Sequence, residues 1–340
     1  MTYALLEGFD HQNPGCLHPA SSAANFVTGR FGGYAVEAPA INSPVILSVP
    51  KHLQGDETTN YWSHYLGFSC RLNTTGNLDV AMLRGVTNDR YLLRVTIESG
   101  SMRAYYPTST STTYNVFSLP LVQGQWHTFE MMSQCVNEGT MAFNREIRVD
   151  GANIYSNVNT IHSYFASTNT GFDEVLLTDD PDFEVDDVRL ELAAGTDSLT
   201  GFLGDRNVVY LAPDGDSAVG WDSSTGANHY DQVNDNSDST YITTAAQSGD
   251  TDTFTFADLP ANVAAVEAVD VQVRARQSAL GTAQLTLHRG GTAGTAQDVD
   301  TLEGSGWNEG IREVFTTDGT DTAWTPASVN SSTFGIVANA

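Results

Sequence analysis

Hydrophobic and polar residues alternate in short runs along most of this chain, and few stretches have the longer period of a helix. Residues 91–98, 126–132 and 269–276 alternate with period two, and Gly, Asn, Asp, Ser and Thr separate such runs. This pattern is typical of antiparallel strands that have one buried and one solvated face. A short helical turn is expected only at residues 259–266. The pattern therefore predicts an all-β chain.

The strand-like runs fall into two blocks, and a length of 340 residues suits two domains of about 150 residues each. We expect two β-sandwich (jelly-roll-like) domains in tandem. The first is predicted over residues 1–193 and ends in the alternating run 184–192. Residues 194–206 are mostly small and polar, so they are predicted to form a linker. A second, smaller sandwich is predicted over residues 207–340.

Charge excludes some classes of function. The chain has 15 Lys and Arg against 41 Asp and Glu, which gives a formal net charge of −26. Such a surface repels phosphate groups, so we expect no binding to nucleic acids or to anionic membranes. The longest apolar stretches are also far shorter than the roughly 20 residues that cross a bilayer, so membrane insertion is not expected.

Cysteine use and the start of the chain indicate the compartment of synthesis. Cys16, Cys70 and Cys135 are widely separated and odd in number, which favours neither a disulfide framework nor a zinc site. Residues 1–7 lack the basic region and apolar run of a secretory signal peptide. We therefore expect synthesis in a cytoplasm, without a signal peptide.

Several segments of the first block resemble, in order, strands of the concanavalin A-like (laminin G-like) jelly-roll superfamily. They are residues 6–10, 30–36, 124–130 with 147–151, and 185–190. The resemblance implies that Trp126 packs between two sheets and that Asp150 and Gly151 turn a hairpin. Since this superfamily contains lectins, hydrolases and structural modules, the resemblance predicts the fold and not the function.

The arrangement of both blocks resembles structural proteins of tailed phages, in which a laminin G-like domain precedes a second small β-domain. The segments that carry this resemblance in the second half are residues 208–216, 221–222, 230–233, 238–242, 252–260 and 324–330. The resemblance implies a virion protein, either a capsid decoration or a tail or fibre component, made in the host cytoplasm. Its expected partners are other capsid or tail proteins and further copies of the chain, and host surface glycans are a further candidate.

A laminarinase-type glycoside hydrolase is a less favoured alternative. Its chemistry requires carboxylates that project from one face of a strand in the pattern Glu-x-Asp-x-Glu. Glu184 and Asp186 supply the first two acids, but Val188 stands where the second glutamate is required. Glu191 falls on the opposite face if the alternation is regular. We therefore expect that the chain is not an enzyme and has no catalytic residues.

One acidic cluster is a candidate calcium site, and Ca²⁺ is the one cofactor that the sequence suggests. Its members are Asp179, Asp180, Asp182 and Glu184. Ca²⁺ binds six to eight oxygen atoms, which carboxylates and carbonyls provide. The alternative interpretation is a solvated acidic loop.

Aromatic residues are the candidate carbohydrate site, because tyrosine and tryptophan rings stack on the apolar faces of sugars. They are Tyr61, Trp62, Tyr65, Tyr105 and Tyr106. The alternative is that Trp62 and Tyr65 fill the core of the sandwich. A sugar-binding adhesin for host recognition is therefore the main alternative to the structural role.

Overall fold

The computed structural model describes residues 2–9, 24–31, 33–48, 61–74, 77–85, 90–107, 112–137, 142–161, 174–194, 199, 201–226, 228–234, 237, 239–244, 249–276, 283–299 and 308–339. The chain forms two compact units, Met1–Val208 and Val209–Ala340. The described residues of the predicted linker, 194, 199 and 201–206, therefore belong to the first unit, which extends 15 residues beyond the predicted end at residue 193.

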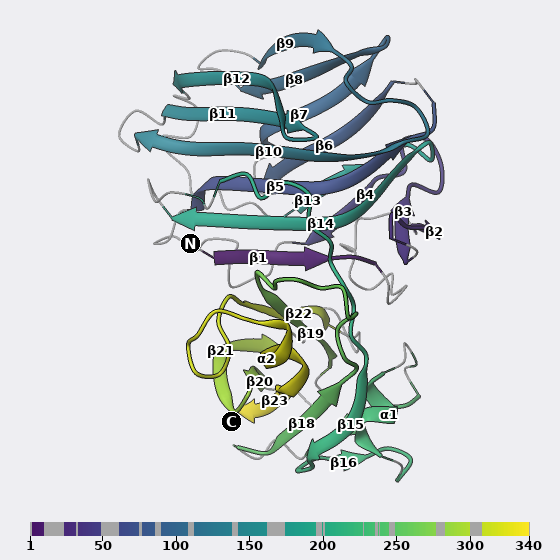
Figure 1. Ribbon diagram of the computed structural model, residues 1–340, viewed down its shortest axis with the longest axis vertical. Helices are drawn as coiled ribbons and strands as arrows, with labels where there is room; N and C mark the ends of the chain where they lie inside the picture. Colours follow the sequence, from purple (N-terminus) through teal and green to yellow (C-terminus); the bar gives the residue numbers. More distant parts are fainter. Residues whose placement is uncertain are drawn as a thin grey trace. The chain divides into compact units, whose positions relative to one another are not determined.

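The first unit is a two-layer antiparallel β-sandwich (Figure 1). One sheet has eight strands, which are β1 (Thr2–Glu7), β2 (Asn25–Thr28), β3 (Tyr34–Glu37), β5 (Tyr61–Leu72), β10 (Trp126–Asn137), β11 (Ala142–Val149), β12 (Ala152–Ile161) and β14 (Phe183–Ala194). Their order is β12-β11-β10-β5-β14-β3-β2, and β1 pairs with β14. The other sheet has six strands, which in spatial order are β4 (Val45–Ser48), β13 (Glu174–Thr178), β6 (Leu78–Gly85), β7 (Arg90–Glu98), β8 (Ser101–Pro107) and β9 (Thr112–Ser118).

The apolar core of the first unit lies between its two sheets, because side chains alternate between the faces of each strand. Leu66 and Phe68 of β5 point into this core, and so do Leu93 and Val95 of β7. The ring of Phe68 stacks on that of Phe129, with 5.0 Å between the centroids. The other face of each sheet is left for the polar residues described below.

The hairpin between β11 and β12 confirms the turn predicted at Asp150 and Gly151. Val149 pairs with Ala152, and the two turn residues have φ angles of 51° and 76°. A two-residue loop with both φ angles positive is the hairpin turn that Asp-Gly favours.

The predicted position of Trp126 is wrong. Phe129 of β10 points into the core, so Trp126, three residues earlier, lies on the opposite face of the strand. It is half-buried there, and the guanidinium carbon of Arg71 lies 5.0 Å from its ring centroid. Trp126 therefore pairs with a cation outside the sandwich core.

A β-bulge interrupts β14, so the regular alternation assumed for this strand is also wrong. The pairing with β5 shifts between Asp186 and Arg189, and Asp187 has a φ angle of 52°. An extra residue reverses the faces of all residues that follow it. Consequently Glu184 and Glu191 share the face of the sheet that is turned away from the core.

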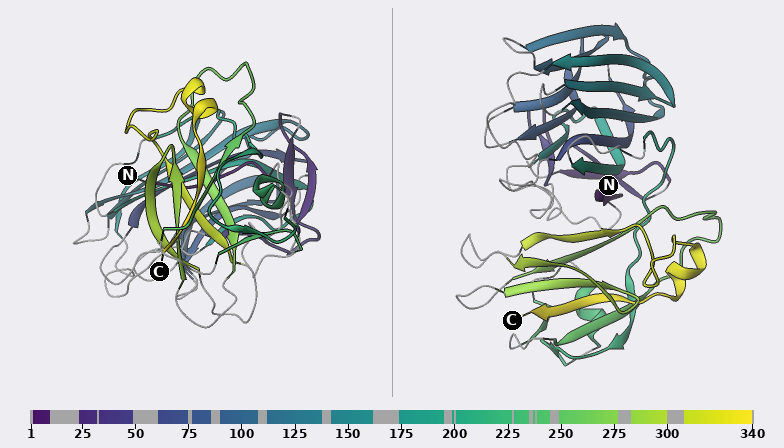
Figure 2. Two further views of the ribbon diagram at one scale, coloured as in Figure 1. Left: turned by 90° about the horizontal axis from the view of Figure 1, so that it is seen from below. Right: turned by 90° about the vertical axis from the view of Figure 1, so that its left-hand side faces the viewer.

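The described residues of the second unit form short strands and two helices (Figure 2). The strands are β15 (Pro213–Ala218), β16 (Asp222–Ser223), β17 (Ile242–Thr243), β18 (Thr251–Phe256), β19 (Val269–Ala275), β20 (Ala283–Arg289), β21 (Thr292–Val299), β22 (Asn308–Phe315) and β23 (Phe334–Asn339). A five-stranded sheet has the order β15-β18-β23-β20-β21. Its core residues Leu287 and Ile336 pack in one cluster with Ile311 and Phe315 of the β19–β22 pair. Two layers therefore enclose this core as well.

The helices of the second unit are short. They are α1 (His229–Val233) and α2 (Pro326–Ser331), and α2 begins with a capping box formed by Thr325 and Ser328. The helical turn expected at residues 259–266 is not found, and the residues form a turn instead. In this turn the amide of Val263 donates to the carbonyl of Pro260. In the described part of the chain, neither helix has the length and hydropathy needed to cross a membrane.

Candidate functional site

The predicted calcium ligands each bind a different protein group. Asp179 accepts a hydrogen bond from the amide of Asp79 at 3.0 Å, and Asp180 accepts one from the amide of Asp182 at 2.8 Å. Asp182 itself accepts the hydroxyl of Thr74 at 2.8 Å. These carboxylates therefore shape the turn that leads into β14.

Glu184, the fourth predicted ligand, forms an ion pair. Its Oε2 atom lies 2.5 Å from Nη2 of Arg71, and Oε1 accepts the side-chain amide of Asn73 at 2.6 Å. Among the described residues, no three His, Cys, Asp or Glu side chains are arranged to hold a metal ion. Calcium binding by the four acids stays a prediction.

Tyr65, one of the predicted sugar-binding aromatics, is fully buried. Its side chain lies on the outer face of β5, where it packs with Leu199 and contacts the ring of Phe202 edge-on at 6.2 Å. The Tyr65 hydroxyl donates to Glu130 at 2.7 Å, and burial raises the pKa of this hydroxyl. Tyr65 is therefore buried in a small hydrophobic cluster on the outer face of the sheet, separate from the main core. The side chains of three other predicted residues, Tyr61, Trp62 and Tyr106, lie outside the described part of the structure.

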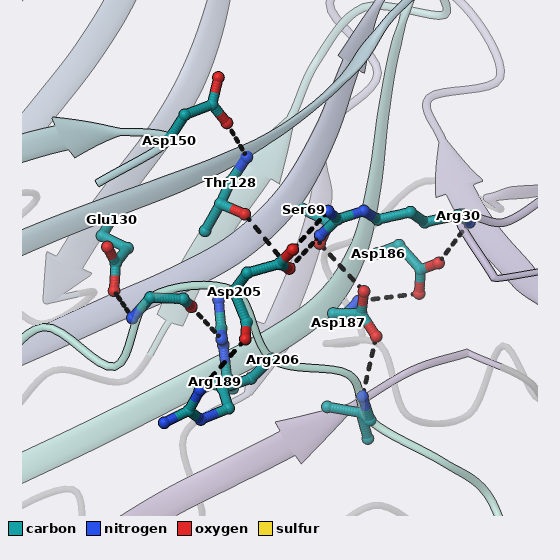
Figure 3. A network of polar contacts seen from close by, with 12 residues as sticks. Arg30, Ser69, Thr128, Glu130, Asp150, Asp186, Asp187, Arg189, Asp205 and Arg206 are labelled. Atoms are coloured by element: carbon teal, nitrogen blue, oxygen red, sulfur yellow. Dashed lines mark hydrogen bonds and ion pairs between the residues drawn. The ribbon is translucent and has the colours of Figure 1, made fainter. Parts of the chain in front are cut away.

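A chain segment that we call the strap, residues 201–208, binds to this outer face through a network of polar contacts (Figure 3). The first contact is an ion pair in which Nη1 and Nη2 of Arg30 each donate to one carboxylate oxygen of Asp205. The Arg30 amide donates to Asp186 at 2.9 Å. Arg30 thereby joins the strap to β14.

The second contact is formed by two buried residues of opposite charge. Glu130 accepts the amide of Gly204 at 2.8 Å, and Arg189 donates to the carbonyl of Gly204 at 2.9 Å. Gly67 pairs with both residues across the sheet, and a Cβ atom at Gly67 would collide with Tyr65 and Arg189. The absence of a side chain at position 67 therefore leaves room for the Tyr65 ring and the Arg189 guanidinium group over this part of β5.

The third contact is made by Asp187, the residue at the bulge of β14. Its two carboxylate oxygens accept the amide of Val208 at 2.8 Å and the hydroxyl of Ser69 at 3.0 Å. Burial raises the pKa of Asp187 above its ordinary value, against the opposing effect of these hydrogen bonds. Both oxygen atoms of the Asp187 carboxylate thus bind groups of the protein.

The solvent-facing side of the six-stranded sheet carries a second cluster, which we call the tyrosine–arginine face. Its members are Arg94 and Glu98 of β7, Arg103 and Tyr105 of β8, and Tyr114 of β9. The rings of Tyr105 and Tyr114 lie 5.0 Å apart and are tilted by 40°. Arg94 lies over the ring of Tyr105 at 5.7 Å, and Arg103 lies over that of Tyr114 at 5.2 Å.

Carboxylates fix the polar groups of the tyrosine–arginine face. Glu98 accepts the hydroxyl of Tyr105 at 2.6 Å and forms an ion pair with Arg103 at 2.6 Å. Asp79 binds Arg94 through two parallel contacts of 2.7 and 3.0 Å. Tyr114 remains 47% exposed. Of the five predicted aromatics, Tyr105 is the one that the described structure places on this face, and the sequence reasoning missed Tyr114 and both arginines.

The second unit contains a buried His–Asp pair that the sequence did not indicate. His229 Nδ1 lies 2.5 Å from Asp252 Oδ2, and Asp252 also accepts the amides of Gly220 and Trp221 at 2.6 and 2.9 Å. Asp252 is inaccessible to solvent. The pair joins α1 to β18, and the 23 residues that separate its members give no motif spacing.

Comparison with known proteins gives no family: no family model matches the chain, and neither does any curated protein sequence. Solved structures do resemble it. A galectin of Caenorhabditis elegans is 14% identical, with a TM-score of 0.30 over 44% of this chain and 91% of the galectin.

Two further solved structures cover more of the chain. An endo-β-1,4-glucuronan lyase of the fungus Trichoderma reesei is 14% identical, with a TM-score of 0.37 over 58% of this chain and 96% of the lyase. A carbohydrate esterase of a Shiga toxin-encoding bacteriophage is 12% identical, with a TM-score of 0.36 over 56% of this chain and 98% of the esterase. At these identities the likeness concerns the β-sandwich fold alone.

Proposed function

We propose that this chain is a non-enzymatic structural protein of a tailed-phage particle, a capsid decoration or a tail or fibre component, that contacts uncharged glycans through its tyrosine–arginine face. The observation that carries the glycan contact is the exposed ring of Tyr114, held 5.0 Å from that of Tyr105. A pre-positioned aromatic pair offers apolar area at little cost in side-chain entropy.

The polar groups around the rings match the hydroxyl groups of a sugar. The guanidinium groups of Arg94 and Arg103 provide donors, and Glu98 provides acceptors. Each arginine is neutralised by a carboxylate, so the face has no net positive charge with which to attract an acidic sugar. The chain as a whole has a net charge of −26, which repels anionic polymers. Uncharged sugars therefore fit the face best.

The absence of enzymatic activity is proposed because three carboxylates of β14, including the two that match the glycosidase pattern, have structural partners. Glu184 is paired with Arg71, Asp186 accepts the amide of Arg30, and Asp187 holds the strap. A retaining or inverting glycosidase needs one carboxylate that exchanges protons with substrate and a second that attacks the sugar or activates water. Glu184, Asp186 and Asp187 instead bind groups of the protein itself.

The virion role is supported by the resemblance of both halves to tailed-phage structural proteins, and by two β-sandwich units that fit such a particle protein. On a particle, many copies act together, so a weak contact at each glycan face suffices for attachment. The alternative function is a sugar-binding adhesin for host recognition. It would use the same face, but it would not be a component of a phage particle.

The glycan contact is tested by binding of the full chain to an array of neutral and acidic glycans. We expect binding to neutral glycans and at least about a tenfold loss in the Tyr114→Ala variant, because the stacking surface is removed. Tyr210→Ala is the matched control, since Tyr210 is 42% exposed in the second unit. Equal binding by both variants, or binding of acidic glycans alone, would overturn the assignment of this face.

The virion role is tested separately, by immunogold electron microscopy with antibodies against the chain. We expect regular labelling of the heads or tails of tailed-phage particles from the lysate in which the protein is made. Glycan binding with unlabelled particles would favour the adhesin over the virion protein.

A further inference from the structure

The last strand of the six-stranded sheet, β9, differs from the other sheet edges of this protein. It pairs with β8 through seven consecutive residues without a register shift, and β8 is its sole strand partner in the described part of the chain. Its sequence, TTYNVFS, contains no charged residue, proline or glycine. Edge strands with these properties present a regular row of backbone donors and acceptors to another chain.

The other described edges carry features that discourage such pairing. β2 and β4 have four residues each, and β16 and β17 have two. β1, β12, β15, β19, β21 and β22 all pair with register shifts. Short length and bulges are the usual protection of exposed edges, and β9 has neither.

We infer that β9 is a docking edge at which a second copy of this chain adds its own β9 in antiparallel orientation. The two-fold axis of the pair passes at Asn115, which places Tyr114 of each copy opposite Val116 of the other. Tyr114 and Val116 point away from the core and are 47% and 57% exposed. Pairs of an aromatic and a β-branched residue directly opposite each other stabilise antiparallel strands.

Charge favours this edge as the place where copies meet. A net charge of −26 opposes contact between copies over most of the surface. β9 is uncharged, and Arg103, the residue that pairs with Val116 in β8, is neutralised by Glu98. Contact at β9 therefore adds no like charges along the strand.

The pairing joins the six-stranded sheets of two copies into one continuous sheet. Antiparallel strands related by a two-fold axis keep the same face outward, so the two tyrosine–arginine faces lie on one side of this sheet. The dimer does not depend on glycan binding. If that binding also occurs, the dimer is bivalent.

The first test is sedimentation velocity of the full chain over a concentration series. We expect a dimer, and in Val116→Lys about a 100-fold weaker association, because a lysine on the edge must be desolvated beside the other strand. Val219→Lys is the matched control, since Val219 is also 57% exposed. A wild-type monomer at all concentrations, or equal association by both variants, would overturn the proposal.

The second test locates the axis by disulfide formation, in a Cys16→Ser background in which Cys70 and Cys135 are buried. Residues opposite each other in antiparallel strands have Cα atoms about 5 Å apart, within reach of a disulfide. Asn115→Cys should therefore form disulfide-linked dimers on mild oxidation. Ser118→Cys should not, because its two copies would lie about 20 Å apart along the strands. Equal cross-linking of the two variants, or none, contradicts the two-fold axis at Asn115.

Discussion

Carboxylates organise both outer faces of the first unit, and on the tyrosine–arginine face Glu98 binds both Tyr105 and Arg103. The Tyr105 hydroxyl that donates to Glu98 holds the pKa of this carboxyl below its ordinary value, and Thr96 and Arg103 act in the same direction. A carboxyl with a lowered folded-state pKa stabilises the fold above its ordinary pKa, and this contribution is lost as pH falls through the lowered value.

Tyr105→Phe should raise the pKa of Glu98 toward its ordinary value, because the largest of its stabilising hydrogen bonds is removed. Carbon-detected NMR titration of the Glu98 carboxyl measures this shift. Tyr114→Phe is the control, since no hydrogen bond joins Tyr114 to Glu98 in the described contacts. An unchanged Glu98 titration in Tyr105→Phe would contradict the geometry of the face.

His229→Ala should destabilise the second unit by about 2 kcal/mol, because the buried Asp252 carboxylate loses a partner and cannot be hydrated. Urea unfolding monitored by tryptophan fluorescence measures the loss. Asp231→Ala, at an exposed position of the same helix, should change the stability by less than about 0.5 kcal/mol. Equal effects of the two substitutions would show that the His–Asp pair contributes nothing.

Local features at the residue scale could be predicted from the sequence. Asp150 and Gly151 turn their hairpin because the conformation of a two-residue loop depends on those residues alone. The place where Tyr65 is buried, on the outer face of β5, could not be predicted, because Phe202, whose ring contacts it, lies more than 130 positions away in the sequence. The sequence predicts either sugar binding or a core position for Tyr65, whereas its ring packs against Phe202 of the strap.

At the scale of elements, the strap depends on buried polar contacts with β10 and β14. Glu130 accepts both the Tyr65 hydroxyl and the Gly204 amide, and it is inaccessible to solvent. A buried donor that loses its acceptor bears the full cost of its desolvation. The attachment of the strap should therefore be sensitive to this one side chain.

Glu130→Ala should destabilise the first unit by about 3 kcal/mol, since two buried donors lose their acceptor. Hydrogen–deuterium exchange should accelerate at the Gly204 amide, while that of β7 to β9 is unchanged. Glu130→Gln, which keeps one acceptor oxygen, should cost only about 1 kcal/mol. Unchanged exchange at Gly204 in Glu130→Ala would contradict the role of Glu130.

The existence of β14 followed from its alternating sequence, but its bulge did not. Asp186 and Asp187 are adjacent acids. Nothing in the neighbouring sequence indicates that Asp186 accepts the amide of Arg30 and that Asp187 accepts the amide of Val208 in the strap. The bulge directs the Asp187 carboxylate toward the Val208 amide and the Ser69 hydroxyl. Both of these residues are far from Asp187 in the sequence, so the strand's own sequence does not predict the bulge. For the same reason the side on which Glu191 lies was predicted wrongly.

At the scale of the whole molecule, each of the two compact units has its own apolar cluster. The all-β class and the number of units could be predicted, because alternation and length depend on sequence alone. The end of the first unit could not. Residues 194–206 are small and polar like a linker, yet those that the structure describes bind the first unit through backbone groups and one ion pair.

Differential scanning calorimetry of the full chain should show two unfolding transitions, because each unit buries a separate core. Glu130→Ala should lower the midpoint of one transition, and His229→Ala should lower the midpoint of the other. A single transition that both substitutions lower equally would show that the chain unfolds as one cooperative unit.

The central claim is that the first unit binds glycans through the tyrosine–arginine face and not through the acids of β14. Hydrogen–deuterium exchange of the full chain, with and without the best neutral glycan from the array, tests it most directly. We predict protection by glycan in residues 94–105 and 112–118, with no change in residues 183–194 or 201–208. Protection confined to β14 and the strap, or to the second unit, would contradict the account.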